Sequence, residues 1–272
     1  MFKLLKYCLS VCVLSISIGS AHAAMIPVGI DISGSLTTST VDAFGSITST
    51  GTEIVGGATS DTDLSAGGVV NSIFTKIGDG LSLLSNVTGN DADGVTYDDF
   101  GNGFLVNLAL AIANTTADTQ RVTLDFGFNI FADAGGSGLD SFIESILFLN
   151  DSVVSLFSEE HTSDTNFGDL VNGVDPDPLT YGASQGTSGT TSYVFDILAG
   201  DALNLAGGSS LRGGAFAANT NFIGDADFSL TIASIENLNT TQPPNPNPVP
   251  EPYTLGMFAL GLALLLRKQL VR

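Results

Sequence analysis

Alternation of apolar and polar side chains is the clearest pattern in this chain. Between residues 122 and 130 every second residue is apolar, and threonine, aspartate, glycine and asparagine occupy the positions between them. A period of two places the apolar side chains on one face of a β-strand and the polar ones on the other. The pattern recurs at 104–112 and at 228–232. These three segments are therefore predicted to be strands with one buried face.

Other parts of the chain add shorter strand signals. Further short apolar segments predict strands at 28–36, 69–76, 81–87 and 153–157. Residues 141–149 fit either a strand or a helix, because their apolar residues also follow helical spacing. Residues 193–198 and 202–205 flank the pair Gly200-Asp201, which predicts a hairpin. Many short strands separated by glycine and small polar residues favour an all-β domain, an antiparallel β-sandwich or jelly-roll-like fold, over residues 24–238.

The composition changes sharply at residue 239. Six of the nine prolines lie between Pro243 and Pro252, interleaved with asparagine. Such a segment favours extended polyproline II, and ten residues at ~3.1 Å each would span roughly 30 Å. Residues 239–249 are therefore predicted to be a semi-rigid linker.

An uncharged segment, 253–266, follows the linker and predicts a single C-terminal hydrophobic helix. At ~1.5 Å per residue this helix would reach roughly 21 Å. A hydrocarbon core of ~30 Å needs about 20 apolar residues, so the helix is short for a permanent transmembrane span. Cations at Arg267, Lys268 and Arg272 favour a cytoplasmic C-terminus, which leaves everything upstream outside the membrane.

Together these parts form a recognisable tail over residues 250–272. Pro250, Glu251 and Pro252 precede the apolar segment, and Arg267 and Lys268 follow it. This order resembles the PEP-CTERM sorting signal of bacterial exosortase substrates. The resemblance implies that these five residues form a sorting and processing motif for an exosortase-type membrane protease or transpeptidase, after transient insertion in the inner membrane.

The N-terminal residues 1–23 predict a signal peptide. Two lysines precede a short apolar stretch, and small residues precede a cleavage site between Ala23 and Ala24. Both cysteines, Cys8 and Cys12, lie within the peptide that would be removed. The exported protein would then have no disulfide, thiolate metal site or cysteine nucleophile.

Charge narrows the range of partners. Residues 24–249 contain 27 acidic residues and only three basic ones, Lys76, Arg121 and Arg212, which gives a net charge of −24. Such a domain repels phosphate polymers, so nucleic-acid binding is excluded. Divalent cations or cationic matrix components are the partners that this charge favours, although acidity also serves solubility alone.

Two apparent catalytic signals are weak. Gly182-Ala-Ser184-Gln-Gly186 fits the pattern of a nucleophile elbow, but prolines precede it and no histidine follows it in the chain. His161 is the only histidine of residues 24–272, and we expect it to be a solvated loop residue rather than a metal ligand. We therefore expect a non-enzymatic protein.

Calcium is the one cofactor that the sequence suggests. Residues 135–143 match a nonapeptide that binds calcium in parallel β-rolls, yet no tandem copy adjoins it, which favours a glycine turn. A second cluster supplies the hard oxygen ligands that calcium prefers, although its spacing departs from the EF-hand loop. Its carboxylates are Asp91, Asp93, Asp98 and Asp99.

Two function classes follow. The first is an exported, non-enzymatic cell-surface or exopolysaccharide-matrix protein, sorted and processed at its C-terminal tag. The alternative is a calcium-dependent carbohydrate-binding or adhesion module on the same fold. The chain has no tryptophan, so sugar stacking would depend on Tyr97, Tyr181 or Tyr193. A degradative enzyme ranks third.

Overall fold

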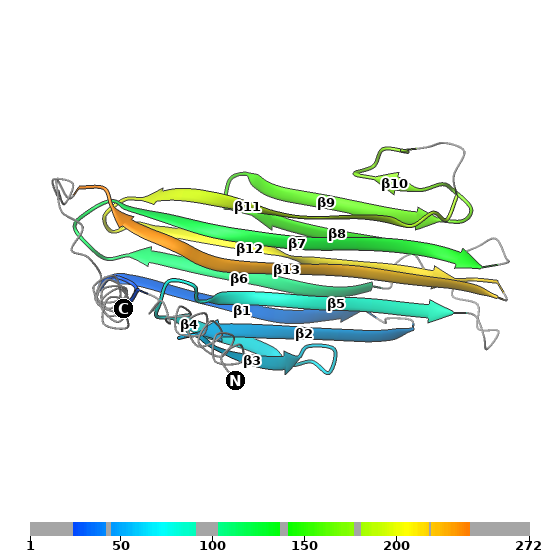
Figure 1. Ribbon diagram of the computed structural model, residues 1–272, viewed down its shortest axis with the longest axis horizontal. Helices are drawn as coiled ribbons and strands as arrows, with labels where there is room; N and C mark the ends of the chain where they lie inside the picture. Colours follow the sequence, from blue (N-terminus) through cyan, green and yellow to red (C-terminus); the bar gives the residue numbers. More distant parts are fainter. Residues whose placement is uncertain are drawn as a thin grey trace, which may run out of the picture. The chain divides into compact units, whose positions relative to one another are not determined.

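The computed structural model describes residues 24–41, 45–90, 103–136, 141–176, 181–217 and 219–239. In these residues thirteen strands form two sheets, and every strand pair is antiparallel (Figure 1). No helix occurs in the described ranges. The all-β prediction is confirmed, whereas the predicted helix 253–266 and linker 239–249 lie almost entirely outside the described residues.

The first sheet has seven strands. Their order is β10 (Leu170–Val171), β9 (Ser155–Asp164), β8 (Ser141–Asn150), β12 (Ala202–Ala215), β6 (Gly103–Asn114), β1 (Ile30–Val41) and β4 (Val69–Phe74). The ambiguous segment 141–149 is therefore a strand, because its alternate residues are buried along the whole of β8.

The second sheet has six strands. Their order is β11 (Gln185–Ile197), β7 (Gln120–Gly136), β13 (Thr220–Asn237), β5 (Gly80–Asn90), β2 (Ser46–Val55) and β3 (Ala58–Asp63). β2 and β3 were not predicted, because serine and threonine dominate both and β3 is almost fully exposed. Backbone pairing to neighbouring strands, rather than an apolar face, forms this end of the sheet.

The predicted hairpin at Gly200-Asp201 is wrong. β11 pairs with β7 in one sheet, whereas β12 pairs with β6 and β8 in the other. The turn crosses between the sheets and is held by Asn114 at the end of β6. The backbone N–H of Asn114 donates to the Asp201 carbonyl at 2.9 Å, and the Asn114 carbonyl accepts from the Gly200 N–H at 2.8 Å. The side-chain amide of Asn114 also donates to the carbonyls of Ile197 (2.9 Å) and Leu198 (3.1 Å).

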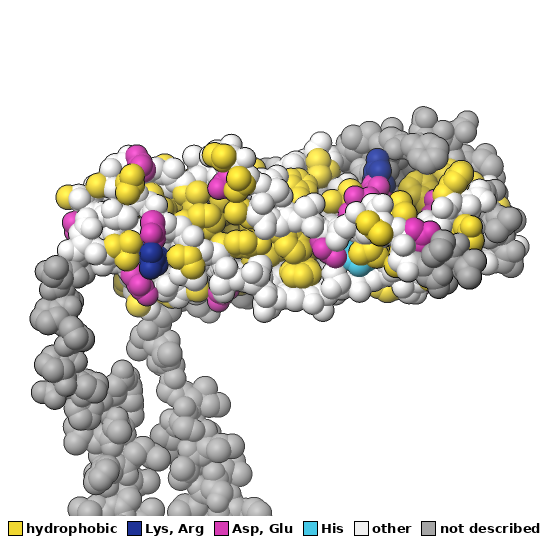
Figure 2. Space-filling view, turned by 90° about the horizontal axis from the view of Figure 1, so that it is seen from above, with side chains coloured by type: hydrophobic (Ala, Val, Ile, Leu, Met, Phe, Trp, Pro, Cys, Tyr) yellow, Lys and Arg dark blue, Asp and Glu magenta, His cyan; other side chains and the backbone are white. Residues whose placement is uncertain are grey.

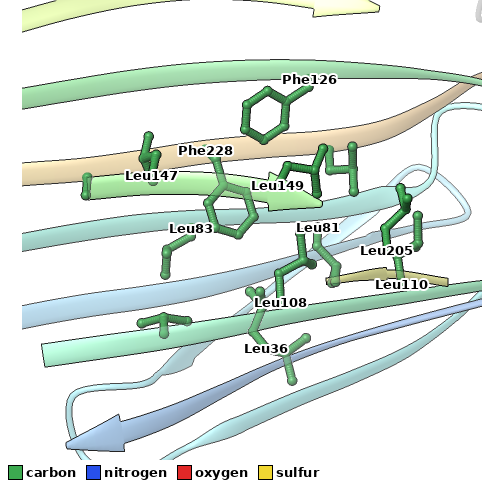
Figure 3. Packing of buried hydrophobic residues seen from close by; sticks show 14 of the residues in the cluster. Leu36, Leu81, Leu83, Leu108, Leu110, Phe126, Leu147, Leu149, Leu205 and Phe228 are labelled. Carbon is green, nitrogen blue, oxygen red and sulfur yellow. The ribbon is translucent and has the colours of Figure 1, made fainter. Parts of the chain in front are cut away.

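The core lies between the two sheets. Apolar side chains from both sheets are buried together, with Phe104 and Phe126 among the largest that are fully buried. Figure 3 labels ten of these side chains, which come from both sheets: Leu36, Leu108, Leu110, Leu147, Leu149 and Leu205 from the first, and Leu81, Leu83, Phe126 and Phe228 from the second. The alternation read from the sequence therefore placed the correct faces inward.

One aromatic ring depends on two glycines. Phe222 on β13 pairs directly with Gly89 on β5, and Gly213 of the opposite sheet lies on the other side of its ring. A Cβ atom added at Gly213 would lie 2.6 Å from the Phe222 ring, and one added at Gly89 would also overlap it. Both positions exclude a side chain in the observed packing.

Candidate functional site

Most of the residues singled out from the sequence lie outside the described residues. These are the sorting motif (Pro250, Glu251, Pro252, Arg267 and Lys268), Ala23 of the cleavage site, and the candidate calcium ligands Asp91, Asp93, Asp98 and Asp99. Ala24 is the first described residue, and its carbonyl accepts a hydrogen bond from the Ile77 N–H at 2.8 Å. The chain is thus attached to the domain from Ala24 onward.

The glycine-rich nonapeptide spans a connection between sheets. β7 ends at Gly136, and β8 begins at Ser141 in the opposite sheet. The alternative of a parallel β-roll is wrong here, because both strands belong to antiparallel sheets. Among the described residues, no group of three or more histidine, cysteine, aspartate or glutamate side chains is placed to hold a metal ion.

The apparent nucleophile elbow is part of an anchoring site. The backbone N–H groups of Gly182 and Ala183 donate to the Asp169 carboxylate, each at 2.9 Å. The same carboxylate accepts from the Asp164 N–H at 3.0 Å, and Asp169 is 0% exposed. Gly182 has a φ of +67°, which glycine tolerates best. Glycine is therefore required at 182 by backbone geometry, and strand β11, not a helix, begins at Gln185.

His161 is not the solvated loop residue that was expected. It lies on β9, is only 3% exposed, and its Nε2 atom is 3.1 Å from Oε1 of Glu159. Within the described residues its Nδ1 atom has no hydrogen-bond partner. The surrounding charged residues in the sequence indicated a surface loop, but alternate residues of β9 point inward, and His161 is one of them.

Two loops beside β9 are held rigidly to the domain. Asp169 anchors residues 164–169 and 181–183 to one another through the three hydrogen bonds above. Asn172 anchors the following turn, because its backbone N–H donates to the Glu160 carbonyl at 2.8 Å and its Oδ1 accepts from the Glu160 N–H at 2.9 Å. We call residues 164–176 and 181–183 the anchored loops; they include the short strand β10, at the upper right of Figure 1.

The anchored loops present two aromatic side chains to solvent. Phe167 is 80% exposed and Tyr181 is 58% exposed. A Cβ atom placed on Gly168 would lie 3.9 Å from Cε1 of Tyr181, so this ring lies beside the residue that follows Phe167. The sequence had marked Tyr181 as an aromatic candidate but not Phe167, because phenylalanine in a β protein usually belongs to the core.

The other two tyrosine candidates have different positions. Tyr97 lies outside the described residues. Tyr193 is partly buried on β11, its hydroxyl donates to the Leu156 carbonyl at 3.1 Å, and its burial raises the pKa of the phenol. Of the described tyrosines that were candidates, Tyr181 is the one whose ring is free to contact a ligand.

The outer face of the second sheet carries a partly buried carboxylate. Asp227 on β13 accepts hydrogen bonds from the Ser85 N–H at 2.9 Å and from the Asn129 side-chain amide at 3.1 Å. Burial is the main cause that raises the pKa of Asp227, and the nearby charge of Asp225 adds to it. A groove of about 430 Å³ lies on β11, β7 and β13 and is lined by the hydroxyl residues Thr190, Thr191, Ser192, Ser229 and Thr231 together with Asp125, Phe126 and Gly127.

A second groove of about 640 Å³ lies on the first sheet. Small side chains from β4, β1, β6 and β12 line it, mainly serine, alanine and asparagine. On the face seen in Figure 2, hydrophobic and acidic side chains are interspersed and basic ones are sparse. Among the charged side chains visible on this face, acidic ones predominate.

Comparisons with known proteins give a limited result. No curated protein matches the chain. Among solved structures, that of infectious bursal disease virus strain Gx is 10% identical, with 79% of this chain and 59% of that chain covered and a TM-score of 0.19. The VP2 subviral particle of the same virus is also 10% identical, with 78% and 67% covered and a TM-score of 0.16. These similarities are too weak to inform fold or function.

The described residues include no helical segment with the length and hydropathy required to traverse a bilayer.

The sorting tail gives a definite match. Residues 248–269 match the model of the PEP-CTERM protein-sorting motif, which includes all five motif residues identified from the sequence. The chain therefore carries a PEP-CTERM protein-sorting motif at its C-terminal end and is an exosortase-targeted exported protein.

Proposed function

We propose that this chain is a non-enzymatic protein of the cell surface or the exopolysaccharide matrix, built as an exported β-sandwich on a removable tail. The PEP-CTERM motif at 248–269 is the observation that carries this proposal. The precursor is inserted transiently in the inner membrane and processed at Pro250–Pro252 by an exosortase-type protease or transpeptidase. The acidic domain is then delivered to the envelope surface or to the matrix.

The physical properties of the tail support a temporary role. Fourteen uncharged residues reach roughly 21 Å as a helix, against ~30 Å of hydrocarbon. A short segment with cations at its cytoplasmic end delays release from the membrane without providing a full span. The preceding proline segment keeps the folded domain away from the bilayer, which gives a membrane enzyme access to Glu251.

The use of buried polar groups supports a non-enzymatic role. The buried carboxylate of Asp169 accepts three backbone N–H groups. The carboxylate of Asp79, which is also buried, accepts from the backbone N–H groups of Gly56, Thr75 and Lys76 at 2.7–2.9 Å. Carboxylates whose oxygens accept several backbone N–H groups hold loops in place, which is a structural role.

Mass spectrometry of the exported protein tests the processing step. We expect the mature C-terminus to lie between Pro250 and Pro252. The variant Glu251→Ala should accumulate with its tail intact, whereas Glu236→Ala, which removes an exposed acid at the end of β13, should be processed normally. Recovery of wild-type chains that end at Arg272 from surface material would contradict the proposal.

The alternative remains a calcium-dependent carbohydrate-binding or adhesion module. The exposed aromatic rings of the anchored loops favour its carbohydrate part. Calorimetric titration of the exported protein with calcium tests the metal part. Absence of both heat release and a change in melting temperature would remove calcium from the proposal.

A further inference from the structure

We propose that the anchored loops bind a polysaccharide whose sugars carry free amino groups, with Phe167 and Tyr181 contacting the sugar rings. This inference rests on the proposed function, because it names the matrix component that the exported domain would contact. The ligand class follows from three properties of the anchored loops and the adjoining strand β9: exposed rings, a hydrogen-bonded frame, and acidic residues without lysine or arginine.

The exposed rings are unusual in this domain. Phe167 and Tyr181 are the two aromatic residues among the exposed large hydrophobic residues of the described ranges. Many other aromatic side chains pack in the core, such as Phe126, whose ring centroid lies 5.1 Å from that of Phe157. Leaving a phenylalanine 80% exposed forfeits most of the ~1.5–3 kcal/mol that its burial would supply. Exposed apolar rings with polar surroundings are typical of recognition surfaces.

The frame fixes the backbone beside both rings before any ligand arrives. The Asp164 carboxylate accepts from the N–H groups of Asn166 (2.7 Å) and Phe167 (2.9 Å), which fixes the backbone at the first ring. The Gly182 N–H, next to Tyr181, donates to Asp169. Gly168 has a φ of +95°, which lets the chain turn between Phe167 and Asp169. A preorganised surface loses little conformational entropy on binding.

The charge of this region selects the kind of polymer. The anchored loops contain Asp164, Asp175 and the buried Asp169, the adjoining β9 adds Glu159 and Glu160, and residues 155–176 and 181–183 contain no lysine or arginine. Nucleic acids, anionic lipids and uronate polymers are repelled by such a surface. An ammonium group is attracted both by the carboxylates and by the face of an aromatic ring. A pyranose that carries an amino group therefore combines an apolar ring face with the complementary charge.

Calorimetry with matched oligosaccharides tests the proposal. The exported protein is titrated with a chitosan oligosaccharide, its fully N-acetylated counterpart and an alginate oligosaccharide at about 0.15 M salt, where charges beyond roughly 8 Å are screened. Phe167→Ala and Tyr181→Ala are compared with Leu84→Ala, which removes an equally exposed residue (60%) from β5. Because all three side chains are exposed, the variants should fold, and melting temperatures will verify this.

We expect the chitosan oligosaccharide to bind in preference to the other two. Each aromatic substitution should weaken that binding roughly tenfold, as expected for loss of one buried ring contact, and Leu84→Ala should leave it unchanged. Absence of binding, equal binding of the acetylated form, or binding unaffected by both aromatic substitutions would overturn the proposal. None of these results bears on the position of the processed C-terminus, so the two proposals fail separately.

Discussion

Replacement of Asp169 by alanine should separate the stability of the anchored loops from that of the core. The carboxylate of Asp169 accepts three backbone N–H groups, from Asp164, Gly182 and Ala183, at 2.9–3.0 Å. A net contribution of ~1.5–3 kcal/mol for each hydrogen bond to a charged group gives a gross value well above 4 kcal/mol. Part of it is offset by the desolvation of a buried carboxylate.

We therefore expect Asp169→Ala to lower the free energy of unfolding by about 4 kcal/mol. Asp169→Asn should lower it by about 2 kcal/mol, because the amide retains one acceptor oxygen and places an N–H group against the remaining donor. Asp201→Ala, at an exposed position in the turn before β12, should change it by less than about 0.5 kcal/mol.

Urea denaturation of the exported protein measures these differences. With a slope of about 2 kcal/mol/M, the alanine variant should unfold at about 2 M less urea than the wild type. Hydrogen exchange should show that the Ala183 amide loses protection first, because its acceptor is gone, whereas the Gly182 N–H still donates to the Asp164 carbonyl at 3.0 Å. A shift below about 0.5 M, or unchanged protection at Ala183, would refute the assignment of Asp169 as the anchor of these loops.

Further expectations concern packing and pH. Gly89→Ala should destabilise the domain by about 1–3 kcal/mol in thermal unfolding, because the new methyl group would overlap the Phe222 ring. Gly135→Ala should be nearly neutral, because its Cβ would lie 3.4 Å from the nearest atom, Oδ1 of Asn221. Asp227→Asn should raise the melting temperature at pH 7 and have little effect below pH 3.8. Burial raises the folded-state pKa of Asp227 above 3.8, so the folded state binds the proton more tightly and wild-type stability falls as pH rises through that pKa. A melting temperature of Asp227→Asn that follows the wild type at every pH would contradict this reasoning.

The sequence was most informative where one face of a strand is buried. The segments at 104–112, 122–130 and 228–232 became β6, β7 and β13, because alternation reports burial directly. β2 and β3 left no such signal, since serine and threonine fill both strands and backbone pairing holds them. Gly200-Asp201 was correctly identified as a turn, but local sequence does not encode which sheet a strand joins. The strands pair with β7, β6 and β8, and the turn between them is held by Asn114, more than eighty residues away from Leu198.

The candidate site was predictable in part. The sorting motif could be identified from 22 contiguous residues, because proline, apolar length and terminal charge are local properties. Tyr181 was marked for its chemistry alone. Phe167 and the role of Asp169 could not be predicted, because exposure and backbone hydrogen bonding arise only when 164–169 and 181–183 meet. His161 was misassigned for the same reason, since the inward direction of β9 is set by its pairing with β8.

The position of β13 in the second sheet has a consequence for export. β13 is the last strand of the domain, yet it pairs with both β7 and β5 and so joins the two parts of its sheet. A chain that is exported from its N-terminus exposes β13 last, so β5 and β7 are outside the membrane before the strand that pairs with both of them. Non-local pairing of this kind folds slowly. Until residues 220–237 have been exported, the second sheet therefore exists only as two separate parts, β11–β7 and β5–β2–β3, and it is completed by the last strand of the described domain.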